Sequence, residues 1–158
     1  MTALELQDDL VKEVERILKD VRTRKVSGEE ASGVTGYRQA LPEVIEDEED
    51  SSQFFPYCIV RLNDAGTEDD NDPWHVRVNF FFGVYDDNRK SNGHQHIMVM
   101  IQRVADRFAA EPLLNKKFRA QQKMEWALPD ENTYPYYFGG LEIAFSVPKI
   151  GRREPKYD

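Results

Sequence analysis

The fold is decided by the stretch Trp74-His75-Val76-Arg77-Val78-Asn79-Phe80-Phe81-Phe82-Gly83-Val84-Tyr85. Apolar side chains recur at every second position of this stretch, and polar ones fill most of the positions between them. Successive side chains of a β-strand point to opposite sides, so the alternation predicts a long strand with one buried face. A chain of 158 residues built around such a strand is expected to form a single domain with one core.

The residues before this stretch predict its strand partner. Phe55–Leu62 is rich in aromatic and β-branched residues, which favours a strand. The loop between the two strands is acidic, with Asp69 and Asp70 near its centre, and ends at Pro73. A polar loop joining two consecutive strands predicts that they pair antiparallel.

Two helices are expected on the same side of the sheet. Residues 2–21 carry apolar side chains at spacings of three and four, and Thr2 with Glu5 fits a capping box. A second apolar stripe follows Gly93 and runs to about Ala110, where Pro112 ends the helix. Ser91 or Asn92 is expected to cap it.

Two further strands complete the predicted sheet. One alternates from Phe118 to Leu128, with Trp126 on the side expected to be buried, and the other alternates from Leu141 to Val147. The prediction is an α+β domain over residues 1–150, with a mostly antiparallel sheet of four strands or slightly more and two helices on one face. Residues 151–158 form a polar tail.

The segment 22–56 is expected to be a long, partly flexible arm. Such a long connection is uncommon inside a compact domain. Val34–Gln39 and Glu43–Glu46 could form a loose hairpin, and 43–50 is acidic at six of its eight positions. Two interpretations of the acidic run stay open, a disordered solvated segment or an arm that meets a basic surface.

Charge is divided unevenly along the chain. Residues 1–79 hold 9 Lys and Arg against 19 Asp and Glu, a net charge of −10, whereas residues 80–158 are at +2. This acidic balance argues against tight binding to duplex DNA, which requires cations at the phosphates. The N-terminus lacks the pattern of a signal peptide, and no apolar run is long enough to span a bilayer. We therefore expect a soluble protein made in the cytoplasm, with no membrane partner.

No catalytic constellation stands out in the sequence. His94 and His96 are two positions apart, which on a helix points them to different sides, and the acidic loop lacks calcium-loop spacing. The single cysteine, Cys58, lies in an apolar run and is expected to be a buried hydrophobic residue. The predictions are no enzyme, no metal and no cofactor. A metal-dependent hydrolase using His75, His94 and acids of 64–72 remains the alternative of another class.

Several short motifs, taken in order, resemble a family of phage proteins. They are the strand Phe55-Pro56-Tyr57-Cys58-Ile59-Val60-Arg61-Leu62, an acidic turn, Gly83-Val84-Tyr85-Asp86, the helix Gly93–Val104, the turn Glu111–Phe118 and Pro135-Tyr136-Tyr137-Phe138-Gly139. Between about Phe54 and Pro148 the chain is similar to the tail terminator, or tail completion, family of long-tailed phages and prophages.

The resemblance implies a structural subunit of the virion. Such subunits form a ring, usually hexameric, that caps the tail tube, offers its other face to the head–tail connector and lets DNA pass through its pore. The partners implied are further copies of the chain, the tail tube protein and the connector protein. Another head–tail joining or neck component is the nearer alternative. The residues expected at subunit or tube interfaces are Tyr37, Leu41, Glu46, Asp47, Glu48, Glu49, Asp69, Asp70, Arg119 and Lys123.

Overall fold

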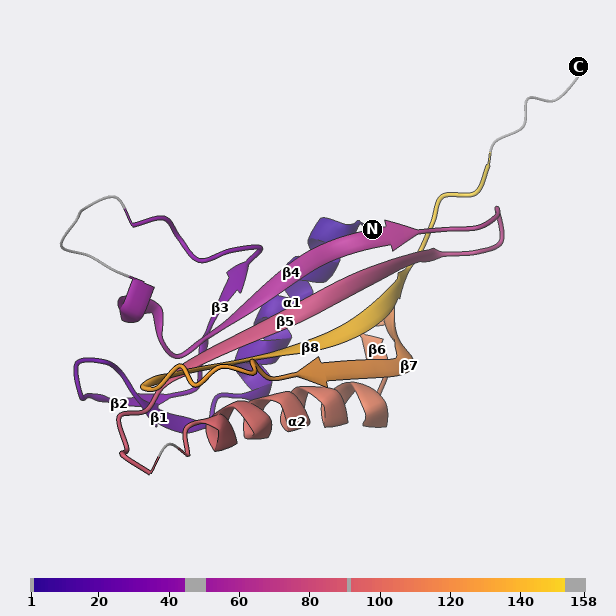
Figure 1. Cartoon of the computed structure of the whole chain (residues 1–158). Helices are drawn as coiled ribbons and strands as arrows, with labels where there is room; N and C mark the ends of the chain where they lie inside the picture. The colour runs from indigo at the N-terminus through magenta and orange to yellow at the C-terminus, as the bar shows by residue number, and fades with distance from the viewer. Residues whose placement is uncertain (1, 45–50, 91, 153–158) are drawn as a thin grey trace, which may run out of the picture.

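The structure, a computed structural model, describes residues 2–44, 51–90 and 92–152 (Figure 1). These residues form an α+β fold with two α-helices and an eight-stranded, largely antiparallel sheet. The α+β class and the antiparallel character agree with the expectation from the sequence. The predicted sheet of about four strands is too small, because short strands before residue 57 and after α2 also join the ladder.

Strand β5 (Trp74–Tyr85) lies at the centre of the sheet. It pairs antiparallel with β4 (Tyr57–Gly66) on one side and, over its whole length, with β8 (Tyr136–Val147) on the other. Outside β8 come β7 (Phe118–Ala127) and the two-residue β6 (Leu113–Leu114). The register of β7 against β8 shifts between Ala120 and Met124, which leaves extra residues on the edge strand.

The segment 22–56 contributes strands to the sheet. β1 (Arg22–Arg24) and β2 (Glu30–Ser32) form a hairpin that joins the end of β5, and β3 (Thr35–Arg38) pairs with β4. The β3–β4 pairing is parallel. The expected hairpin of Val34–Gln39 with Glu43–Glu46 falls partly outside the described residues and stays a prediction. The residues 45–50 lie outside the described part of the chain. A short 3₁₀ helix, η1 (Ser51–Phe54), precedes β4.

Both helices contribute to one core. Helix α1 (Ala3–Ile17) packs beside β3 and β4, and α2 (His94–Ala110) lies along β5, β8 and β7. Every second residue of the long strands packs against these two helices, so the inner face of the sheet is buried. Glu13 and Arg107 join the helices through an ion pair of 2.8 Å. The fully buried large side chains are Phe80, Phe82, Phe108, Phe118, Phe145, Leu6, Leu10, Leu18, Ile97, Met100, Ile101 and Leu141.

The ends of the helices differ in part from the sequence prediction. The Thr2 hydroxyl accepts a hydrogen bond from the Glu5 amide, as the capping motif predicts. α2, however, has Gly93 at its N-cap without a side-chain hydrogen bond; Asn92 contributes its carbonyl oxygen instead of its side chain. Ser91 lies outside the described residues.

Trp126 is exposed, although its ladder partner Leu141 lies on the buried face of the sheet as the alternation predicts. Its side chain is 55% accessible. It lies on β7 beyond the register shift, where the strand follows the edge of the sheet. An edge strand has no neighbour on its outer side to cover a large side chain, so the alternation of residue types overestimates burial there.

Side chains close the β3–β4 edge of the sheet. The carboxylate of Glu15 accepts the Gly36 amide at 3.1 Å. The Gln39 amide accepts the Leu62 N–H and donates to the Leu62 carbonyl, both at 2.9 Å, and Gln7 donates to the Gln39 oxygen at 2.8 Å. Backbone N–H and C=O groups that already form hydrogen bonds with side chains cannot pair with a further strand. This edge is therefore protected from strand addition at Gly36 and Leu62.

The close packing of α2 on β8 gives the first prediction. A Cβ at Gly139 would overlap Cγ2 of Ile97 and lie 3.0 Å from Leu128, whereas nothing lies within 4 Å of a Cβ at Gly66. We expect Gly139→Ala to lower the free energy of unfolding in urea by about 1–3 kcal/mol through overpacking. The control Gly66→Ala should change it by less than about 0.5 kcal/mol. Equal effects of the two substitutions would show that the helix does not pack closely here.

Candidate subunit interface

The outer face of the sheet is hollowed at one end. We call this region the sheet hollow, a depression of about 690 Å³ on the face opposite the helices. Phe81 is 39% exposed and Trp126 55% exposed, and Gly140, which has no side chain, lies beside Phe81. Further residues that line the hollow are Ile59, Ala127, Leu128, Pro129 and Phe138.

Aromatic packing supports the rim of the hollow. Phe55 packs against Tyr57, Tyr136 and Phe138 with ring centroids 4.9, 5.0 and 5.9 Å apart. Burial raises the pKa of the Tyr57 hydroxyl to about 12, so this ring stays neutral at physiological pH. The segment Tyr134–Phe138 therefore packs in part as an aromatic cluster, and Phe138 also lines the hollow.

Charged side chains continue along the same face towards the β4–β5 turn. Arg77 forms an ion pair with Asp64 across β4 and β5 and lies 3.5 Å from Glu142 on β8. The hydrogen bond from Arg77 holds the pKa of Asp64 below its usual value. Arg61, which lines the hollow, is exposed and has no ion-pair partner within residues 2–44, 51–90 and 92–152. The two carboxylates that line the hollow already face cations, Glu125 at 3.3 Å from Lys123 and Glu142 at 3.5 Å from Arg77. The hollow thus combines an apolar floor with an arginine, Arg61, that is available to an acidic partner.

The turn between β4 and β5 is held by the C-terminal residues. The ammonium group of Lys149 donates to the Thr67 hydroxyl at 2.9 Å and to the Asp69 carbonyl at 2.5 Å. Arg152 lies 3.4 Å from Asp70. We call residues 67–72 with 149–152 the tail-bound turn. Between its two basic anchors, Ile150 is 92% exposed.

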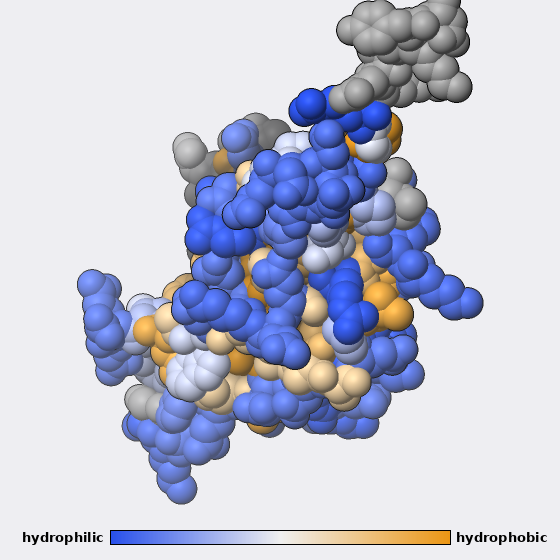
Figure 2. Space-filling view, turned by 90° about the vertical axis from the view of Figure 1, so that its right-hand side faces the viewer, coloured by the Kyte–Doolittle hydropathy of each residue, from blue (hydrophilic) through white to orange (hydrophobic). Residues whose placement is uncertain are grey.

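His75 connects the same turn to the sheet through contacts of both ring nitrogens. Its Nε2 lies 2.7 Å from the Asp72 carboxylate, and its Nδ1 lies 2.5 Å from the side-chain nitrogen of Gln121 on β7. The hydrogen bonds from His75 and from the Glu68 amide lower the pKa of Asp72. These contacts connect the turn with both β5 and β7. Figure 2 views the molecule from this end, where hydrophobic residues form separate patches among hydrophilic ones.

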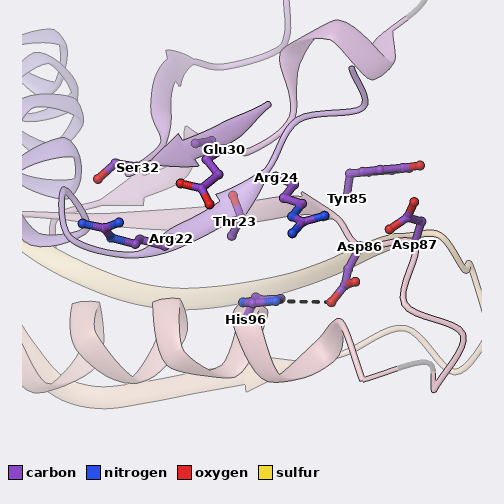
Figure 3. A pocket seen from close by; sticks show the side chains of 10 residues that line it. Arg22, Thr23, Arg24, Glu30, Ser32, Tyr85, Asp86, Asp87 and His96 are labelled. Carbon is purple, nitrogen blue, oxygen red and sulfur yellow. Dashed lines mark ion pairs between the residues drawn. The ribbon is translucent and has the colours of Figure 1, made fainter. Parts of the chain in front are cut away.

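A second depression lies between the β1–β2 hairpin and the start of α2 (Figure 3). It has a volume of about 470 Å³, and its wall carries charges of both signs, including Arg22, Arg24 and Glu30. Asp86 points to His96, with 3.3 Å between Oδ2 and Nε2. The buried hydroxyl of Thr23 has no hydrogen-bond partner in the described part of the chain. Mixed charge and one free hydroxyl do not define a ligand class.

The interface residues expected from the sequence fall into three groups. Tyr37 on β3 and Leu41 just after it lie at one edge of the sheet, and Tyr37 packs on Phe54 at 5.8 Å. Arg119 and Lys123 lie on β7, at the opposite side of the strand order. Asp69 and Asp70 belong to the tail-bound turn. The run Glu46, Asp47, Glu48 and Glu49 lies outside the described residues.

Sequence reasoning missed the sheet hollow and Ile150. The alternation predicts a buried Trp126, and it indicates no role for Phe81. The signal available was the sequence Phe80-Phe81-Phe82, in which the middle aromatic has to point away from the core in any strand. The contact of Lys149 with the acidic turn has no local sequence signal, because 80 residues separate the Lys149 and Asp69 partners.

The residues of the hydrolase alternative do not come together. His75 lies at the start of β5, while His94 begins α2, which follows the far end of β5. Residues 2–44, 51–90 and 92–152 hold no group of three or more His, Cys, Asp or Glu side chains suited to a metal ion. Cys58 is fully buried, as expected, and burial raises the pKa of its thiol well above the usual range. In the same residues, no helix has the length and apolar character needed to cross a bilayer.

Comparison with known proteins adds no family assignment. No family model matches the chain, and no curated protein is significantly similar to it.

The ion pair beside the hollow gives a prediction for carboxylate titration. The folded pKa of Asp64 is depressed by Arg77, so its contribution to stability is present above the unfolded pKa and is lost as pH falls through the folded pKa. We expect Arg77→Gln to raise the pKa of Asp64 towards 3.8, as measured by carbon NMR of the side-chain carboxyl. Asp72, whose partners are His75 and Glu68, serves as the internal control and should not shift. A shift of both carboxyls would point to a general change in the fold.

Proposed function

We propose that the chain is a structural subunit of a long-tailed phage that assembles into a ring at the end of the tail tube. By its resemblance to the tail terminator family, the ring is hexameric, stops tube growth and presents its other face to the head–tail connector. DNA passes through the pore without being bound by sequence. The protein is made in the bacterial cytoplasm, becomes part of the neck of the virion and acts without enzymatic chemistry.

The observation that carries this proposal is the contrast between the two faces of the sheet. The inner face is buried under both helices, whereas the outer face keeps Phe81 accessible in a hollow whose rim is formed by the edge residue Trp126. Aromatic side chains in a surface hollow are typical anchors of protein–protein interfaces. Together with the ordered motifs between Phe54 and Pro148, this face supports an assembly protein.

Opposite charge at two sides of the sheet also supports head-to-tail association. The acidic run 43–50 follows the β3 edge, while Arg119 and Lys123 are exposed on β7. Subunits that meet through two different surfaces form a ring when the rotation closes. Opposite charge on those surfaces accelerates encounter and fixes the relative orientation. We propose that the acidic run of one subunit approaches the β7 side of the next.

Tube-length measurement tests the proposed function. The chain is added to tail tube protein of the same phage during polymerisation, and tubes are measured by electron microscopy. We expect short tubes that carry a ring at one end. Unrestricted tube growth, or rings bound only to the connector, would contradict tail termination; the second result would identify a head–tail joining protein.

Neutralising the acidic run tests its role without shortening the chain. We expect Glu46→Gln, Asp47→Asn, Glu48→Gln and Glu49→Gln together to weaken self-association at 50 mM salt about tenfold or more, with a smaller effect at 500 mM salt because salt screens the attraction. Sedimentation velocity measures the change. The control replaces Asp20, Glu29, Asp130 and Glu131, which are exposed, in the same way. If both quadruple variants associate equally, the charge of the run has no specific role.

A further inference from the structure

We propose that the tail-bound turn of one subunit inserts Ile150 into the sheet hollow of a second copy. This inference rests on the proposed self-association and names the contact that makes it. It is carried by the juxtaposition of an exposed apolar side chain on a tethered segment and an unfilled aromatic hollow on the same molecule.

The anchored C-terminal segment presents Ile150 to solvent in a fixed position. Single exposed apolar residues are common, but a segment held at both ends loses little further entropy on binding. Lys149 and Arg152 attach the segment to Thr67, Asp69 and Asp70, which leaves Ile150 between two fixed points. The side chain is 92% exposed, more than any other large hydrophobic residue described. The structure thus presents a preorganised apolar projection.

The hollow offers both an apolar surface for Ile150 and a positive charge for the acidic turn beside it. Phe81, Ile59 and Phe138 provide apolar contact area on the outer face, and Gly140 leaves room above the sheet. Arg61 at the hollow lacks an acidic partner among the described residues, and the tail-bound turn carries Glu68, Asp69 and Asp70. An inserted Ile150 would therefore bring acidic side chains towards an unpaired guanidinium. Such complementarity fixes the orientation of the two copies.

The hollow that Ile150 fills has to belong to another molecule. β8 ends at Val147, which pairs with Trp74 at the start of β5. Phe81, in the hollow, pairs with Gly140 and therefore lies seven residues along β5 from that end. Seven residues of strand span about 23 Å. Ile150 follows Val147 by three residues, which reach at most about 11 Å. The projection and the hollow therefore form a heterologous pair of surfaces, the kind from which rings are built.

Disulfide trapping between two single variants tests the contact directly. One copy carries Ile150→Cys and the other Ala127→Cys, because Ala127 is exposed, lines the hollow and shares the face of Phe81. The mixture is oxidised mildly; the native Cys58 is buried and does not compete. We expect a cross-linked dimer from this mixture. The control uses Val26→Cys with Ala127→Cys, because Val26 is an exposed branched residue on the β1–β2 turn. Cross-linking as strong in the control, or none in the test pair, would overturn the proposal.

A second variant separates this contact from the proposed function. We expect Ile150→Asp to weaken self-association about tenfold to hundredfold, the range for removing one buried branched side chain, while Val26→Asp leaves it unchanged. Ile150 makes no core contact at 92% exposure, so folding is retained and can be checked by circular dichroism. Rings that form equally well with Ile150→Asp overturn the contact and leave the ring proposal intact. A chain that caps tubes but never self-associates in solution or on the tube overturns both the contact and the ring.

Discussion

The structure depends on one constraint, the two-sided character of β5. Its residues alternate, so Val76, Val78, Phe80 and Val84 require an apolar partner on one side only. Both helices supply that partner, and β4 and β8 extend the buried face on either side. The residues between these apolar positions point to the opposite side, so their side chains form the outer face of β5. Here these positions hold Arg77 and Phe81, so the core that stabilises the fold also fixes the charge and shape of the open surface.

Much of the fold could be predicted from periodicity. The two helices, the antiparallel β4–β5 pair and the burial of Cys58 follow from local patterns that tertiary contacts do not override. The short strands of 22–38 could not be predicted, because three or four residues give too little alternation to recognise. The parallel pairing of β3 with β4 is set by long-range contacts, including the Gln39 amide on Leu62.

The candidate interface was predictable only in part. Charge led to Asp69, Asp70, Arg119 and Lys123, because runs of like charge are visible in a sequence. The exposure of Trp126 depends on a register shift in β7 and on the edge position of that strand, which local alternation does not encode. The anchoring of Ile150 depends on Lys149 meeting a turn far away in the chain. Surfaces formed by segments that are distant in the sequence can be recognised only in the three-dimensional structure.

The central claim is that this subunit acts by closing a ring with copies of itself. The proposed head-to-tail association would use the open face, the two dissimilar edges and the tail-bound turn, and the resemblance of the sequence motifs implies the same role. Native mass measurement over a range of protein concentrations, with and without tail tube protein, tests the claim most directly. The account predicts one closed species of fixed subunit number, six by the family resemblance, in solution or on the tube. A chain that stays monomeric at every concentration and on the tube would contradict it.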